Sequence, residues 1–288
     1  MVPDRHALLR RSASRLYRNR VKPALKRGLL NVRPQATLDE QDYVVHTADN
    51  LLPGLSIRDI EREFTAGAGG ELKGKMRAPW SSSALAVNAF LPWRMHRDAV
   101  PVLDLGSFAL PFAFEAKCPN KVSRTPPHLD VLFKTDHKIV AVESKCTEFV
   151  QGSAHLAVSA RYLALEAAHD PRASSHWFRA LASTAGFALL DSYQLVKHYL
   201  GLRNTYPDDE LTLAYLYWEP ANAAAEPVFL AHRDEVARFA GLVASDTTCR
   251  FVHASYEDLW RQWASLSGAP AWLPAHLELL QHRYLVDM

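Results

Sequence analysis

Short runs of hydrophobic residues, rich in β-branched and aromatic side chains, occupy the middle of the chain and predict β-strands. Three of them follow one another closely, at 112–118, 129–134 and 139–146, with turn-forming residues between them. Two more, at 211–218 and 250–254, are separated from these by longer segments of a different pattern. The spacing therefore predicts three consecutive strands and two strands that join later in the chain.

Elsewhere, apolar residues recur at intervals of three and four, which is the spacing of an amphipathic helix. Ser81, Ser82 and Ser83 stand where one such helix would begin and are suitable N-terminal caps. Gly201 follows another and is expected to end it, because glycine is common just past a helix C-terminus. Helices are expected at 56–64, 81–91, 154–168, 185–200, 233–243, 256–265 and 275–285. Three strands followed by alternating helices and strands predict an α/β protein with a mixed central sheet flanked by helices.

Composition fits a folded protein of ordinary size. The 288 residues are 48% hydrophobic and 22% charged, which excludes a disordered chain, a collagen-like fibre and a disulfide-stapled mini-protein. Three scattered cysteines are too few for a zinc cluster, and their odd number argues against a closed set of disulfides. A reducing, cytoplasmic location is expected, and no apolar run is long enough to cross a membrane.

The charge is unevenly distributed along the chain. Residues 1–30 contain nine basic side chains and a single acid, whereas the remainder of the chain carries a net charge of −6. Two interpretations follow: the segment contacts phosphates as a basic arm, or it is an amphipathic helix packed through Leu8, Leu9, Leu16 and Tyr17. We expect residues 1–69 to form this arm and a helical N-terminal extension, and residues 70–288 to form the main domain.

The chemistry is concentrated in the hairpin expected from the second and third strands. With Asp136-His137 at the tip of a two-residue turn, the pairing places Asp130 opposite Glu143. Strand alternation then points Glu143 and Lys145 to the same face. Like charges directly opposed are normally destabilising, so a cation is expected between the two carboxylates.

Two carboxylates and an amine at one point suit phosphodiester cleavage. Carboxylate oxygens are ligands of Mg²⁺, and Lys145 would orient or deprotonate the attacking water or offset developing negative charge. The alternative is a solvated strand pair in which Lys145 bridges Asp130 and Glu143 as a surface ion pair. The hairpin pairing, its apolar strand cores and the preceding Pro126-Pro127 favour the catalytic interpretation.

These residues carry a family resemblance. Leu129-Asp130, followed by Val142-Glu143-Ser144-Lys145, resembles the active-site signature of the PD-(D/E)XK nuclease superfamily, which has a restriction-endonuclease-like fold. The resemblance implies that Asp130 and Glu143 bind Mg²⁺, with Mn²⁺ as a substitute, that the Ser144 carbonyl completes the metal shell, and that Lys145 is the catalytic lysine.

The resemblance also implies two assisting residues. Gln194 lies in a segment, 191–198, that resembles the glutamine-bearing helix beside the active site of several such nucleases, although a structural hydrogen bond would explain it too. Glu71 matches the acidic residue that a preceding helix often supplies, but a helix N-terminus also favours glutamate. Glu115, Glu148 and His128 are left as open candidates near the metal or the substrate.

The sequence therefore predicts a metal-dependent endonuclease that hydrolyses DNA. The alternatives are a catalytically silent nucleic-acid-binding domain on the same fold and a nuclease that acts on RNA. A homodimer is attractive for double-strand cleavage, because each strand then has its own site. No zinc motif, P-loop or serine-hydrolase elbow is present to support another chemistry.

Overall fold

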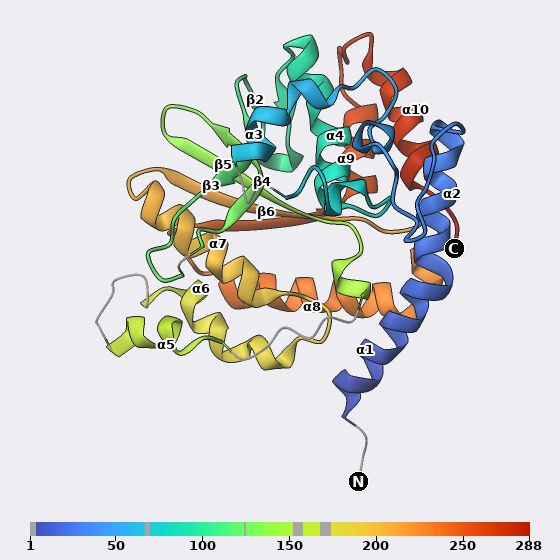
Figure 1. The fold of residues 1–288 in the computed structure, drawn as a ribbon. Coiled ribbons are helices and arrows are strands. Elements are labelled where there is room, and N and C mark those ends of the chain that lie inside the picture. The colour runs from blue at the N-terminus through green and yellow to red at the C-terminus, as the bar shows by residue number, and fades with distance from the viewer. Residues whose placement is uncertain (1–3, 67–69, 124, 152–157, 168–173) are drawn as a thin grey trace.

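A five-stranded mixed sheet forms the centre of the computed structural model (Figure 1). The structure describes residues 4–66, 70–123, 125–151, 158–167 and 174–288. In spatial order the strands are β3 (Ala113–Lys117), β4 (His128–Lys134), β5 (Lys138–Lys145), β6 (Glu210–Tyr217) and β7 (Arg250–Ser255). The first three are antiparallel, β6 pairs with β5 in parallel, and β7 pairs with β6 in parallel. This confirms the predicted α/β class with its mixed central sheet.

Helices cover both faces of this sheet (Figure 1). In that view α4, α9 and α10 lie above it, and α6, α7 and α8 lie below it. A separate two-stranded sheet pairs β1 (Val100–Pro101) with β2 (Ser107–Phe108). The α-helices are α1 (Arg5–Leu16), α2 (Lys22–Val32), α3 (Glu61–Ala66), α4 (Ser82–His96), α5 (Ala160–Ala167), α6 (His176–Arg179), α7 (Ser192–Thr205), α8 (Pro227–Val243), α9 (Tyr256–Ala264) and α10 (Leu273–Tyr284). Within the described ranges, no helix is both long and apolar enough to span a membrane.

Several helix boundaries differ from the expected ones because capping groups determine them. The helix expected at 185–200 begins only at Ser192, since the Asp191 side chain accepts a hydrogen bond from the backbone N–H of Gln194. The helix expected at 81–91 begins as predicted after Ser81 but continues to His96. The segment 56–64 divides into a 3-10 turn and α3. Residues 154–157 and 168 of the helix expected at 154–168 lie outside the described residues, and α5 occupies part of the remainder.

The β4–β5 hairpin has the expected register. Val131 pairs with Val142, and Lys134 pairs with Ile139. The backbone N–H of Thr135 donates to the carbonyl of Lys138 at 2.9 Å, which closes the two-residue turn. Continuing this register by one pair places Asp130 opposite Glu143, as the alternation predicts.

The basic N-terminal segment is a long helix packed against the rest of the protein. A π-helical turn at Tyr17–Val21 joins α1 to α2, whose Leu25 and Leu29 are buried. Leu9, Leu16 and Tyr17 pack against the core as the amphipathic interpretation expects, but Leu8 is 45% exposed, which corrects that part of it. Residues from both sides of the expected boundary at 69–70 belong to one hydrophobic cluster, and the division into two domains remains a prediction.

Many of the basic side chains in this segment have partners elsewhere in the protein. Lys22 and Lys26 form ion pairs with Asp42, and Arg20 forms one with Glu226, which lies far away in the sequence. On α10, the fully buried Arg283 donates to the backbone carbonyl of Leu25 at 3.0 Å. These contacts explain part of the charge excess by packing, and phosphate binding by the segment remains a prediction.

Gly201 does not end α7, which corrects the expectation from its sequence. The helix continues to Thr205, and Gly201 lies against the end of β3. A Cβ atom at this position would approach the carbonyl oxygen of Cys118 to 2.4 Å. Glycine is therefore required here for close approach of two backbones and not for a left-handed cap.

We expect Gly201→Ala to destabilise the fold by about 2 kcal/mol, because the added methyl group overpacks a backbone contact. Gly241→Ala is the matched control, since this helical glycine on α8 is exposed and has nothing within 4 Å of the new methyl group. That variant should gain about 0.5 kcal/mol through helix propensity. Urea unfolding measures both values, and equal stability of the two variants would contradict the packing explanation.

Candidate active site

Three carboxylates form a row across adjacent strands of the sheet. The β3–β4 pairs Phe114 with Val131 and Ala116 with Leu129 place Glu115 opposite Asp130. The β4–β5 register places Asp130 opposite Glu143. The row is therefore a consequence of register in two neighbouring hairpins, and the sequence reasoning had found only one of the two pairs.

Glu115 occupies a strained position in this row. Its φ angle is 51°, a left-handed conformation that is uncommon for a residue with a Cβ atom. Its carboxylate lies 3.2 Å from Nδ1 of His128. Burial and the negative charges of Glu71 and Glu143 raise the pKa of Glu115 to about 7. Strained backbone and a perturbed carboxylate often occur together at functional sites.

Asp130 lies between the other two carboxylates. One of its oxygens accepts a hydrogen bond of 2.7 Å from the backbone N–H of Ser144. Burial, together with the negative charges of Glu143 and Glu115, raises the pKa of Asp130 well above its usual range. The repulsion that the opposed geometry predicts is thus present in the structure.

Glu143 is 2% exposed and is held by two groups. The Lys145 ammonium lies 2.6 Å from one carboxylate oxygen, and Nε2 of His198 lies 2.9 Å from the other. Although burial opposes ionisation, Lys145 and His198 outweigh it and lower the pKa of Glu143 to about 2. Glu143 is therefore ionised, whereas Asp130 is not readily ionised beside it.

Lys145 is also bound by α7. Its ammonium donates to the side-chain oxygen of Gln194 at 2.8 Å. Burial disfavours the charge of Lys145, but attraction by Glu143, Glu148 and Asp130 prevails and raises its pKa above the usual range. Lys145 consequently stays protonated, which favours an electrostatic or proton-donating role over that of a base.

His198 is a residue that the sequence reasoning missed. It lies four residues after Gln194 and thus on the same face of α7. That spacing is the signal that could have found it. Both side chains reach the ion pair of Glu143 and Lys145 from one helix.

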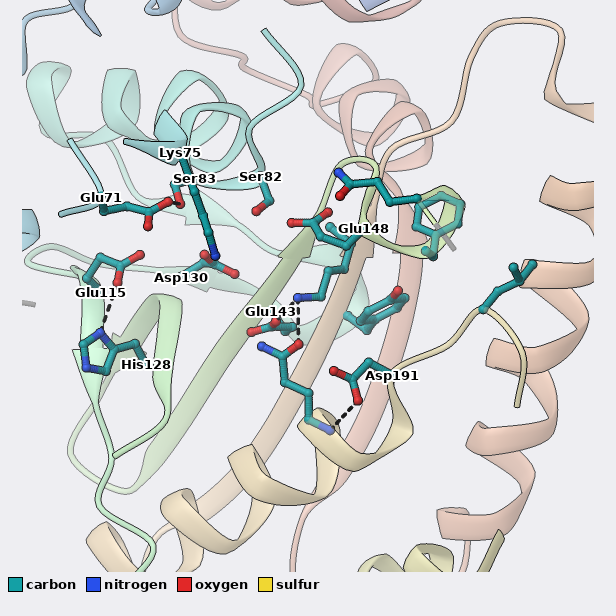
Figure 2. Close-up of a pocket in the computed structure, with 16 residues that line it drawn as sticks. Glu71, Lys75, Ser82, Ser83, Glu115, His128, Asp130, Glu143, Glu148 and Asp191 are labelled. Atoms are coloured by element: carbon teal, nitrogen blue, oxygen red, sulfur yellow. Dashed lines mark hydrogen bonds and ion pairs between the residues drawn. The ribbon is translucent and has the colours of Figure 1, made fainter. Parts of the chain in front are cut away.

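One cavity of about 390 Å³ brings most of the expected residues together (Figure 2). Asp130, Glu143 and Lys145 line it from the hairpin, Gln194 lines it from α7, and Glu71 lines it from the turn before α4. All five candidates for catalysis are therefore adjacent to the same space.

Of the remaining candidates, Glu115, His128 and Glu148 also line the cavity, whereas Ser144 does not. Ser144 is not among the described residues that line the cavity, because its side chain accepts a hydrogen bond from Tyr256 and donates to the Ser82 carbonyl on the opposite face. The metal role of its carbonyl stays a prediction. Glu148 lines the cavity, but one oxygen accepts hydrogen bonds from the backbone N–H groups of Cys146 and Thr147.

The donor chemistry fits a hard cation. Carboxylate oxygens line the cavity, and burial together with the neighbouring carboxylates raises the pKa values of Asp130 and Glu115. In the described part of the chain, no three His, Cys, Asp or Glu side chains already converge as a ligand set. The carboxylates that would bind Mg²⁺ are present, and Glu143 is instead engaged by Lys145 and His198.

Comparison with known proteins agrees with the fold. Residues 18–285 match the family described as Restriction Endonuclease associating with ARP. No curated protein and no solved structure matches the chain. The family match extends over almost the whole chain, including α2, all five strands of the central sheet and the cavity. It confirms the restriction-endonuclease resemblance drawn from the hairpin motif, and the chain belongs to this family of restriction endonucleases.

Proposed function

We propose that this protein is a metal-dependent endonuclease that hydrolyses phosphodiester bonds of DNA at the cavity between the β4–β5 hairpin and α7. The observation that carries the proposal is the row Glu115, Asp130 and Glu143 with the ammonium of Lys145 at its end. Opposed carboxylates destabilise a fold unless a cation or a proton reduces their repulsion, and such groups are common at functional sites. The presence of all three signature residues favours an active nuclease over a silent binding domain.

Asp130 and Glu143 would hold Mg²⁺ or Mn²⁺, and Glu71 and Glu115 are near enough to the same cavity to assist. When bound, the ion would supply Lewis-acid stabilisation to oxygens of the phosphate. His198 holds Glu143 from the side opposite to Lys145 and so restricts the orientation of its carboxylate.

Lys145 would act on the phosphate directly. Its ammonium is protonated and held between Glu143 and Gln194, so it offers a fixed positive charge where negative charge develops during attack by water. Gln194 is a positioning residue in this scheme, because its side chain contacts Lys145 and restricts the path of the ammonium. A preorganised charge of this kind costs little reorganisation during the reaction.

A nuclease assay on the full chain tests the proposal. Supercoiled plasmid, single-stranded DNA and RNA are incubated with the protein in Mg²⁺, Mn²⁺ or EDTA. We expect cleavage of DNA in either metal and none in EDTA. Cleavage of RNA alone would make RNA the substrate in place of DNA. Binding of DNA without cleavage in any metal would favour a catalytically silent nucleic-acid-binding domain.

The free energy of unfolding should rise when Mg²⁺ or Mn²⁺ is added, because the ion relieves the repulsion among the carboxylates and binds only the folded arrangement. At a tenfold excess over the dissociation constant the gain is about 1.4 kcal/mol. Thermal melting with sodium chloride at matched ionic strength as the control measures it. Asp130→Asn should lose the response, and an unchanged melting temperature of the unsubstituted protein would contradict metal binding at this site.

A further inference from the structure

The charges around the cavity are unbalanced. Six acidic residues line it, and the only described lysines or arginines that do so are Lys75 and Lys145. A nucleic acid brings further negative charge to this space, so its phosphates need cationic groups that are not already used. The acidic lining is as follows: Glu71, Glu115, Asp130, Glu143, Glu148 and Asp191.

Lys145 is not available for this purpose beyond the reacting phosphate. Its side chain is only 12% exposed, and its ammonium is bound by Glu143 and Gln194. Lys75 differs in each respect. It is exposed, and it extends from the opposite wall of the cavity toward Asp130 in Figure 2. No hydrogen bond or ion pair of its ammonium is found among the described residues.

The backbone that carries Lys75 is firmly held although its side chain is free. Lys75 begins a 3-10 turn that ends at Arg77. The buried side chain of Asn50 donates to the carbonyls of Met76 and Ala78 at 2.8 and 2.7 Å. Arg77 forms an ion pair of 2.6 Å with Asp39. The turn therefore holds the base of the lysine on one wall of the cavity.

The residue before it is constrained as well. A Cβ atom at Gly74 would meet the carbonyl oxygen of Gly70 at 2.8 Å, so the chain closes tightly just before Lys75. On the same wall, Ser82 and Ser83 line the cavity from the first turn of α4, whose N-terminal end carries a partial positive charge. A rigidly mounted, unpaired ammonium beside this helix end is suited to an anion.

We infer that Lys75 binds a backbone phosphate of the nucleic acid and thereby seats the substrate over the carboxylate row. This inference rests on the proposed nuclease function and adds a substrate-binding residue to it. Lys75 would contact a non-bridging phosphate oxygen, which carries no base information and therefore contributes affinity without sequence preference. It does not take part in the chemical step.

The test compares Lys75→Gln with the matched control Lys73→Gln. Lys73 is exposed two residues earlier and is not among the described residues that line the cavity. Both substitutions are made in the full chain carrying Lys145→Gln, so that binding is measured in Mg²⁺ without cleavage. The probe is a fluorescein-labelled DNA oligonucleotide, single-stranded and duplex, titrated by anisotropy over a series of salt concentrations.

Loss of one phosphate contact should weaken binding roughly five- to tenfold and reduce the slope of log affinity against log salt by about 1. Lys75→Arg should restore the slope, because it keeps the charge, and Lys73→Gln should leave it unchanged. With Lys145 present, Lys75→Gln should raise KM for cleavage while kcat stays within about twofold.

Two failures are distinguishable. If the Lys145→Gln protein binds DNA and the added Lys75→Gln leaves its salt slope unchanged, the role of Lys75 is overturned and the proposed function stands. The same holds if Lys75→Gln, with Lys145 present, lowers kcat without raising KM. If the unsubstituted protein neither binds nor cleaves nucleic acid, the proposed function fails and the inference fails with it.

Discussion

Lys145→Gln is expected to lower the rate of DNA cleavage about 1,000-fold. The reason is that the ammonium is the fixed positive charge at Glu143, and removal of one preorganised charge-stabilising group commonly costs this much. Asp130→Asn and Glu143→Gln should lower the rate of cleavage to a similar extent, because each weakens Mg²⁺ binding. Rates are measured on plasmid DNA at saturating metal.

The matched control is Lys138→Gln, on the same strand but at its other end, where the lysine is 3.9 Å from the exposed Glu210. It should cleave DNA at the unsubstituted rate. Circular dichroism and thermal melting must show that Lys145→Gln is folded, since among the described residues His198 is then the ion-pair partner that Glu143 retains. Cleavage by folded Lys145→Gln within tenfold of the unsubstituted rate would refute the assigned role.

The second large effect concerns the dependence of stability on pH in metal-free protein. The folded state raises the pKa of Glu115 from 4.5 to about 7, through burial and the charges of Glu71 and Glu143. A raised pKa means that the folded state binds the proton more tightly than the unfolded chain. Its stabilising contribution is therefore complete below pH 4.5 and is lost as the pH rises to 7.

Glu115→Gln removes this dependence. Relative to the unsubstituted protein, the free energy of unfolding of the variant should increase by on the order of 3 kcal/mol between pH 4.5 and pH 8. Urea unfolding in EDTA at several pH values measures the difference. Glu278→Gln, at an exposed position of α10, is the control and should run parallel to the unsubstituted protein. If the free energy of unfolding of Glu115→Gln also changes with pH as that of the unsubstituted protein does, Glu115 is not held in the carboxylate row.

Local sequence was sufficient to predict the geometry at the centre of the candidate site. Asp136-His137 closes a two-residue turn, and the alternation of apolar and polar positions leaves one register for the hairpin. The opposition of Asp130 and Glu143 follows from that register alone. The same local logic predicted the five strands and the mixed α/β class, because strand periodicity and turn residues act over only a few positions.

Only tertiary structure decided what surrounds that hairpin. The local sequence around a glycine is the same whether the glycine ends a helix or allows a neighbouring backbone to approach. Gly201 allows such an approach, because the carbonyl of Cys118, far away in the sequence, packs against it. That contact helps to seat α7, which carries Gln194 and His198 to Glu143. The pairing of Glu115 with the row depends likewise on how β3 joins β4, which no turn of fixed length determines.

The charge of the N-terminal segment separates the two levels in the same way. Composition alone establishes that residues 1–30 are strongly basic, and this suits either phosphate binding or packing. Tertiary structure provides Asp42 and Glu226 as partners for three of these side chains, at separations that no periodicity encodes. Sequence therefore determined which groups are charged and which strand faces they occupy. Long-range packing decided which charges are neutralised and which, like that of Lys75, remain available to a ligand. The reason is that the energy of a charge depends on neighbours that only the fold brings together.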